Sequence, residues 1–287
     1  MAALARDRRS SSTTIALHLL DAAAIYVSSL TPENWDEGVR HLNSCIRKLS
    51  LAQSSMPQIA GIGERIGEVT RRRPDFRAGH KDSVRGRLAN LRKSIIDSRS
   101  RVAENIASLL PPGSTVVTLS YSSEVLEGIT RAHQLGGVGL VIVSESRPGT
   151  EGIALCRALR ERGIPTRLIP DAAIARAVAE ADIGLVGADS VSLGGAVSSK
   201  IGSHLLALAC RQFGKPFCVT CSSFKIGRAE DRAKSGGNEI KENPLFESTS
   251  PALVSRYITE DGVLTPVQFR YRYAKGQAKG PTRCRGA

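Results

Sequence analysis

The stretch IGLVGADSVSLGGAVSSKIGSHLLALACRQFGKPFCVTCSSFK, residues 183–225, decides the fold that we predict for this chain. It opens with a short apolar run at residues 183–186, followed by a polar loop that contains two adjacent glycines. A helical spacing of apolar residues begins at 198–200, and a second apolar run follows at 217–219. The order strand, glycine loop, helix, strand predicts one βαβ crossover.

Charged and hydroxyl side chains follow the strands of this unit. Asp189 comes directly after the first strand, and Lys225 comes just past the second. Ser198, Ser199 and Lys200 lie where we predict a helix N-terminus, which favours an anion. Ligands of open α/β sheets bind beyond the carboxyl ends of the strands, so this set suits a phosphorylated, hydroxyl-rich small molecule. The alternative is that Asp189 only caps a turn and that both lysines are solvated.

Before this stretch, the chain changes its periodicity near a Pro-Pro-Gly sequence at 111–113. Residues 1–110 show helical spacing throughout, and residues 111–287 alternate short apolar strands with helices. We predict an α/β protein with an N-terminal all-helical domain and a C-terminal Rossmann-like domain built on a doubly wound parallel sheet. The remaining predicted strands and helices of the second domain are 115–119, 122–131, 139–143, 150–161, 165–169 and 171–179.

Two further strand ends carry candidate binding residues. Ser122 and Ser123 open the helix that follows the first strand of the second domain, and they offer a second anion site. Arg147 follows the next strand and has the fork geometry that binds phosphate. The alternatives are that Ser122 is a plain N-cap and that Arg147 forms a structural pair with Glu145 or Glu151.

The composition of the chain limits the kinds of partner that we expect. The chain has 287 residues and a formal net charge of +13, but its basic residues are dispersed and carry no interleaved aromatic residues. We therefore do not expect nucleic acid as a partner, and a nucleic-acid-binding protein remains an alternative that rests on charge alone. No apolar run reaches the length of a membrane span, so no membrane partner is expected.

The six cysteines are scattered, which is typical of a reducing compartment, and we expect a cytoplasmic location. Cys218 and Cys221 form a C-x-x-C pair, but no second pair stands at zinc-binding spacing. We therefore expect neither a metal site nor a cofactor.

Several motifs together resemble one protein family. They are GADSV, GGAVSSKIGS, LALAC, KPFCV and SSFK within 187–225, ESRP with EG at 145–152, the D-A-A element that starts at Asp171, and NPLFESTSPALVSRYITEDGVLTP at 243–266. The family joins the regulatory subunits of initiation factor 2B, ribose-1,5-bisphosphate isomerase and methylthioribose-1-phosphate isomerase. The resemblance covers about residues 80–268. It implies the same two domains and an assembly of dimers or higher oligomers.

One departure from the family bears on catalysis. The isomerases carry T-H-C at the end of the first strand, and the resemblance implies that the cysteine exchanges a proton with the aspartate of G-A-D. This chain keeps that aspartate as Asp189 and has Ser120 in the place of the cysteine. A serine hydroxyl is a far weaker acid than a thiol, whose pKa is about 8.5. Of the predicted catalytic pair, Asp189 is therefore kept, and Ser120 replaces the cysteine.

The resemblance and the residues lead to one expectation. We expect a family member that binds a sugar phosphate or a nucleoside monophosphate, acts as a regulatory protein and lacks full isomerase activity. Its partners would be a second copy of itself and, as a further candidate, an initiation factor 2B complex. The alternative is an active aldose–ketose isomerase that uses Asp189 on a phosphorylated pentose such as ribose-1,5-bisphosphate. The residues predicted to bind the ligand are Ser122, Ser123, Arg147, Ser199, Lys200 and Lys225.

Overall fold

The computed structural model describes residues 2–6, 11–53, 57–71, 81–227 and 245–276. The chain divides into two compact units, Met1–Ser100 and Arg101–Ala287. Helix α5 (Lys81–Leu109) runs across this division and ends just before the Pro-Pro-Gly sequence at which we placed the domain boundary.

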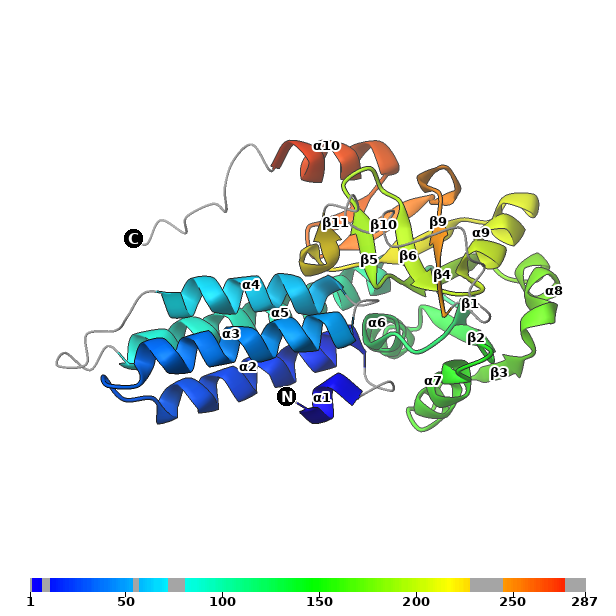
Figure 1. The fold of residues 1–287 in the computed structure, drawn as a ribbon. Helices are drawn as coiled ribbons and strands as arrows, with labels where there is room; N and C mark the ends of the chain where they lie inside the picture. Colours follow the sequence, from blue (N-terminus) through cyan, green and yellow to red (C-terminus); the bar gives the residue numbers. More distant parts are fainter. Residues whose placement is uncertain (1, 7–10, 54–56, 72–80, 228–244, 277–287) are drawn as a thin grey trace. The chain divides into compact units, whose positions relative to one another are not determined.

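In the first unit, every described element is a helix (Figure 1). The Ser11 hydroxyl starts α2 by accepting the N–H of Thr14 at 3.2 Å. Gly63 of α4 lies so close to Ile46 of α3 that a Cβ there would overlap the isoleucine side chain. None of the helices in the described ranges is both long and apolar enough to cross a bilayer. Besides α5, the helices are α1 (Ala2–Arg6), α2 (Ser12–Ser29), α3 (Trp35–Ala52) and α4 (Pro57–Arg71).

The second unit is built on a seven-stranded sheet with the strand order β11-β10-β7-β4-β1-β2-β3. All neighbouring strands pair in parallel except β10 and β11, which are antiparallel. This arrangement confirms the predicted doubly wound parallel sheet. The strands are β1 (Ser114–Leu119), β2 (Val138–Ser144), β3 (Thr166–Ile169), β4 (Ile183–Gly187), β7 (Phe217–Thr220), β10 (Arg256–Thr259) and β11 (Gly262–Leu264).

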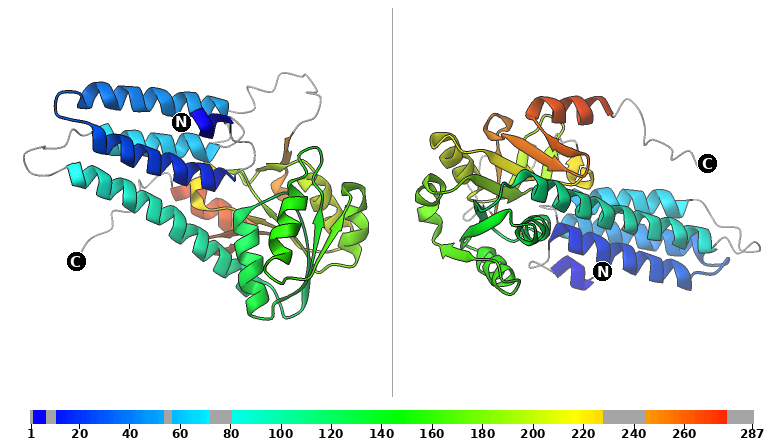
Figure 2. Two further views of the ribbon diagram at one scale, coloured as in Figure 1. Left: turned by 90° about the horizontal axis from the view of Figure 1, so that it is seen from below. Right: turned by 180° about the vertical axis from the view of Figure 1, so that it is seen from behind.

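Helices cover both faces of this sheet (Figures 1 and 2). Side chains of α8, α9 and α10 pack on one face together with Val117 of β1, and side chains of α6 and α7 pack on the other together with Val116. Neighbouring residues of a strand point to opposite faces, so a strand buried on both sides is apolar throughout. The helices are α6 (Ser123–Gln134), α7 (Glu151–Arg160), α8 (Ile174–Ala179), α9 (Ser203–Gln212) and α10 (Pro266–Gly276).

A small second sheet corrects one prediction. Residues 198–200 do not open a helix, because they belong to strand β6, which pairs antiparallel with β5 and with β9. Gly202, at φ 98°, ends this extended segment, and α9 begins at Ser203. The strand order is β8-β5-β6-β9, with β5 (Ser190–Ser192), β6 (Val197–Lys200), β8 (Ile226–Gly227) and β9 (Phe246–Thr249).

Candidate functional site

The strand order of the large sheet reverses between β1 and β4. From β1 the chain proceeds outward to β2 and β3, and it then returns to place β4 on the other side of β1. Helices α6 and α9, which follow these two strands, cover opposite faces of the sheet. Such a switch point opens a crevice at the carboxyl ends of the strands. Ser120 follows β1 and Asp189 lies just past β4, so the two predicted catalytic residues lie at the same edge of the sheet.

Ser120 has a constrained backbone. Its φ is 60°, in the left-handed region that non-glycine residues seldom occupy. Its N–H donates to the Ser146 hydroxyl at 2.6 Å, and Ser146 itself has φ 64°. The loops that follow β1 and β2 are therefore tied to each other. Strained positions of this kind cluster at functional sites.

Asp171 organises the loop after β2, which the sequence did not predict. Its carboxylate accepts the N–H of Ser146 at 2.8 Å and the N–H of Arg147 at 2.7 Å, and it also accepts the Ser144 hydroxyl. Asp171 does not act as the N-cap of the short 3-10 turn 171–173, because Pro170 occupies that position. Asp171 can reach this loop because β3 pairs in parallel with β2. The residues that follow β3 therefore lie next to the loop that follows β2.

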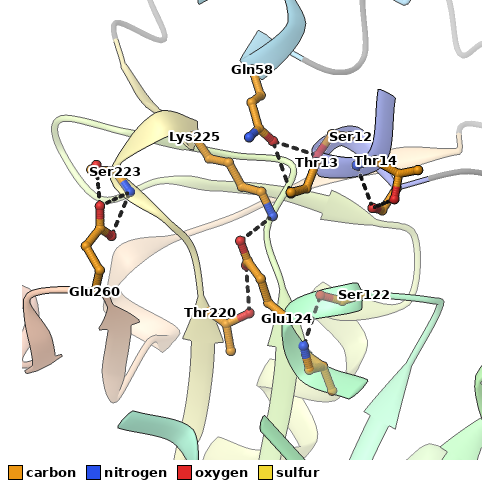
Figure 3. A network of polar contacts seen from close by, with 12 residues as sticks. Ser12, Thr13, Thr14, Gln58, Ser122, Glu124, Thr220, Ser223, Lys225 and Glu260 are labelled. Carbon is orange, nitrogen blue, oxygen red and sulfur yellow. Dashed lines mark hydrogen bonds and ion pairs between the residues drawn. The ribbon is translucent and has the colours of Figure 1, made fainter. Parts of the chain in front are cut away.

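Lys225 forms a buried ion pair with Glu124 (Figure 3). The Lys225 Nζ lies 3.0 Å from Glu124 Oε1, and 5% and 1% of the two side chains are exposed. The Thr220 hydroxyl donates to the second carboxylate oxygen of Glu124 at 3.3 Å. Glu124 was missed from the sequence because an acid in the first turn of a helix is common for the helix dipole alone.

Lys200 and Arg147 are also paired with carboxylates. Lys200 Nζ lies 2.5 Å from Glu151 Oε1 and 5.7 Å from the centre of the Phe246 ring. Arg147 Nε lies 3.3 Å from Glu145 Oε2, and 65% of its side chain is exposed. The alternative interpretation of Arg147 as a partner of Glu145 is therefore observed. Each of the three cations predicted to bind phosphate has a carboxylate neighbour.

The serines at the start of α6 have a local structural role. Ser122 caps the helix by accepting the N–H of Val125 at 3.3 Å, as the plain N-cap interpretation predicted. Ser123 is the first residue of the helix and is half-buried. Gly187, the glycine of G-A-D, lies directly against Ser122, because a Cβ on it would come within 2.5 Å of the Ser122 Cβ. Loop and strand therefore approach closely at the switch point.

The N-terminus of α9 is not an open anion site. The His204 N–H in its first turn donates to the Glu247 carboxylate of β9 at 2.8 Å. Ser199 and Lys200 precede this turn as part of β6. The Ser199 side chain is fully buried, and its hydroxyl oxygen has no hydrogen-bond partner among the described residues. The predicted grouping of Ser199 and Lys200 around a helix N-terminus is therefore wrong.

Buried thiols near the strand ends are poor acids. Burial raises the pKa of Cys210 and of Cys218 to about 12, and burial together with the nearby Glu124 raises the pKa of Cys221 further still. Cys221 follows β7 and has no exposed surface. Among the residues that the structure describes, no three His, Cys, Asp or Glu side chains gather in a way that would hold a metal ion.

A cavity of about 350 Å³ lies at the opposite edge of the sheet. Its lining includes Ser114, Ile183, Pro216 and Arg256, which lie at the amino ends of β1, β4, β7 and β10. None of the predicted site residues lines it. We therefore keep the carboxyl edge, with Ser120 and Asp189, as the candidate site.

Comparisons with known proteins place the chain in a family. The model of the initiation factor 2 subunit family matches residues 8–266. A translation initiation factor eIF-2B subunit 2-like protein of Pyrococcus horikoshii is 29% identical over 272 residues, which are 91% of this chain and 93% of that protein. A ribose 1,5-bisphosphate isomerase of Archaeoglobus fulgidus is 27% identical and covers 84% of this chain and 80% of its own.

A solved structure agrees with these matches. The translation initiation factor eIF-2B of Pyrococcus horikoshii superposes with a TM-score of 0.79 at 28% identity, over 92% of this chain and 95% of that one. The matched region contains the whole seven-stranded sheet and the switch point between β1 and β4. The chain therefore belongs to the initiation factor 2 subunit family.

Proposed function

We propose that this chain is a family member that binds a sugar phosphate or a nucleoside monophosphate at the carboxyl edge of β1, β4 and β7 and does not isomerise it. It acts in the cytoplasm as a self-associating regulatory protein. The observation that carries this proposal is Ser120, which follows β1 where the isomerases of the family carry a cysteine. The second residue of the catalytic pair, Asp189, is kept at the end of β4.

The chemistry of isomerisation supports the loss of activity. Moving a proton between adjacent carbons of a sugar phosphate needs groups whose pKa values lie near the working pH. The Ser120 hydroxyl does not meet this requirement, because its pKa is far above that of a thiol. Cys218 and Cys221, the described thiols in and just after β7, do not replace it, because burial raises the pKa of each. Asp189 alone leaves the proton transfer without its second group.

Phosphate binding is supported by the cations at the same edge. Lys200 and Arg147 belong to segments around the switch point, and the start of α6 at Ser122 and Ser123 adds a helix N-terminus. Each of these cations holds a carboxylate in the structure. An anionic ligand that binds the buried Lys200 would therefore exchange with the Glu151 carboxylate, and a phosphate, which carries more charge and more acceptor oxygens, is suited to that exchange.

The regulatory part of the proposal comes from the relatives. One relative and one solved structure, both from Pyrococcus horikoshii, carry the name of translation initiation factor eIF-2B. We infer a homodimer or higher oligomer for this chain and name an initiation factor 2B-type complex as a candidate partner. Sedimentation velocity tests the oligomeric state directly. A protein that remains monomeric at micromolar concentration would contradict the proposed self-association.

The alternative function is an active isomerase. It is favoured by the retention of Asp189 at the switch point and by the 27% identity to the ribose 1,5-bisphosphate isomerase of Archaeoglobus fulgidus. Under this alternative Asp189 acts as the acid on a phosphorylated pentose, and a group other than a thiol acts as its partner.

Phosphorus NMR tests ligand binding. We would record spectra of ribose-1,5-bisphosphate, methylthioribose-1-phosphate, hexose phosphates and AMP with the purified protein. We expect at least one ligand resonance to broaden, and we expect the broadening to decrease in Arg147→Ala. Unbroadened resonances for all of these ligands at protein concentrations near 0.1 mM, a value that corresponds to roughly 5.5 kcal/mol of binding free energy, would contradict the proposal.

A further inference from the structure

We propose that Glu151 is an internal competitor for the ligand: its carboxylate holds Lys200, and the phosphate of a bound ligand takes its place. This inference rests on the proposed function, because it concerns the same site. It also gives different roles to the two lysines, since Lys200 exchanges its partner and Lys225 does not.

The Lys200–Glu151 pair is close but only partly enclosed. The two charged atoms lie 2.5 Å apart, and 8% of the lysine side chain and 25% of the glutamate side chain are exposed. The second carboxylate oxygen of Glu151, Oε2, is buried and has no hydrogen-bond partner among the described residues. The carboxylate is therefore held through one oxygen alone, and a quarter of the Glu151 side chain is exposed.

The loop before α7 is shaped to allow this contact. Glu151 is the first residue of α7, and its carboxylate folds back over Gly149 so closely that a Cβ there would overlap it. Gly149 does not have a left-handed φ, so its backbone tolerates alanine. Thr150 between them has φ 60° and makes no side-chain cap for the helix. A glycine at 149 is thus needed for the side chain of Glu151 to reach Lys200, rather than for the turn itself.

The Lys225–Glu124 pair differs in the burial of its carboxylate and in the contact that Thr220 adds. Only 1% of the Glu124 side chain is exposed, and Thr220 holds its second oxygen. Displacing Glu124 would leave a buried carboxylate without a partner, which is far less favourable than moving Glu151 toward solvent. We therefore assign the ligand phosphate to Lys200 and a structural role to Lys225.

A competitor of this kind sets both affinity and selectivity. The apparent affinity falls by the fraction of molecules in which Lys200 is released, so removing Glu151 strengthens binding. A sugar without phosphate has no group that replaces the carboxylate on Lys200. The wild-type protein should therefore discriminate strongly between a phosphorylated sugar and the same sugar without its phosphate.

The test uses calorimetric titration of the whole protein with glucose 6-phosphate and with glucose. We expect Glu151→Gln to lower the Kd for glucose 6-phosphate by about tenfold, the change that follows when about one tenth of the molecules have Lys200 released. Gly149→Ala should act in the same direction, because it moves the carboxylate without removing its charge. Glu161→Gln makes the same charge change at the far end of α7 and should leave the Kd within about twofold.

The outcomes separate this inference from the proposed function. If the wild-type protein binds glucose 6-phosphate and Glu151→Gln binds it equally or more weakly, the competitor role is wrong and the proposed function stands. If Glu151→Gln binds more tightly but keeps that gain when Lys200→Gln is added, the phosphate does not bind Lys200. If neither the wild type nor the variants bind glucose 6-phosphate, ribose-1,5-bisphosphate, methylthioribose-1-phosphate or AMP, with unchanged circular dichroism, both proposals fail.

Discussion

The Lys225 ammonium and the Glu124 carboxylate lie 3.0 Å apart, and at most 5% of either side chain is exposed. This pair connects the segment after β7 with the first turn of α6. Removing two charges from water is costly, so a buried pair of this kind is weak evidence for stability but a sensitive point of the structure. In this pair Lys225, which the sequence predicted to bind the ligand, binds a carboxylate of the protein itself.

Breaking this pair should destabilise the fold. Glu124→Gln leaves Lys225 as an uncompensated buried charge, and we expect the free energy of unfolding to fall by about 3–5 kcal/mol. Urea unfolding followed by circular dichroism measures this change. Glu104→Gln is the matched control, because its pair with Arg131 is exposed and should contribute less than about 1 kcal/mol. Equal effects of the two substitutions would show that the burial of Glu124 is not maintained in solution.

The glycine of G-A-D should not tolerate a methyl group. In Gly187→Ala the new Cβ would come within 2.5 Å of the Ser122 Cβ, so the start of α6 must shift. We expect a loss of about 1–3 kcal/mol, from overpacking and a weakened N-cap. Faster hydrogen exchange of the Val125 amide reports the same shift. Gly194→Ala is the control, since the nearest atom to its Cβ is 3.7 Å away, and a similar loss there would argue against this explanation.

Asp171 should control the loop that carries Arg147. In Asp171→Asn the amide has the same shape but only one acceptor oxygen for the N–H groups of Ser146 and Arg147. We expect a loss of about 1–3 kcal/mol and faster hydrogen exchange at these two amides. Unchanged exchange at both amides would contradict the role that the structure gives to Asp171.

The C-terminal helix α10 should show a pH-dependent attachment. The hydrogen bond from Arg272, with a further one from Tyr273, holds the pKa of Asp261 below its ordinary value of 3.8. A carboxyl group with a lowered folded-state pKa stabilises the fold above its unfolded-state pKa, and this contribution is lost as the pH falls through the folded-state value. We expect Asp261→Asn to cost about 0.5–1 kcal/mol at pH 7 and to have no effect well below pH 3.8. If Asp261→Asn lowers the free energy of unfolding equally at pH 7 and at pH 2.5, the ion pair between Asp261 and Arg272 is not the source of the loss.

The large sheet was predictable because its strands are buried on both faces. The predicted strands 115–119, 139–143 and 217–219 match β1, β2 and β7 to within one residue at each end. Short apolar runs rich in β-branched residues and bounded by Gly or Pro favour buried strands over helices. The order of strands and helices then fixed which loops meet at the carboxyl edge, and Ser120 and Asp189 were placed there for that reason.

The hairpin β5–β6 was not predictable in the same way. Residues 197–200 carry two serines and a lysine, and they become a strand by pairing with β9, about fifty residues further along the chain. The partners of the lysines were missed for a related reason. Glu124 and Glu151 open helices, where acids are common, and only the packed structure shows that each one faces a lysine.

In our proposal, the exchange of cysteine for Ser120 leaves a binding site without isomerase chemistry. A phosphorus NMR time course of ribose-1,5-bisphosphate with the wild-type protein and with Asp189→Asn tests this. We predict broadening of the substrate resonances and no product resonance from either protein over a day. A product resonance that grows with the wild-type protein and is absent with Asp189→Asn would contradict the claim and establish an isomerase.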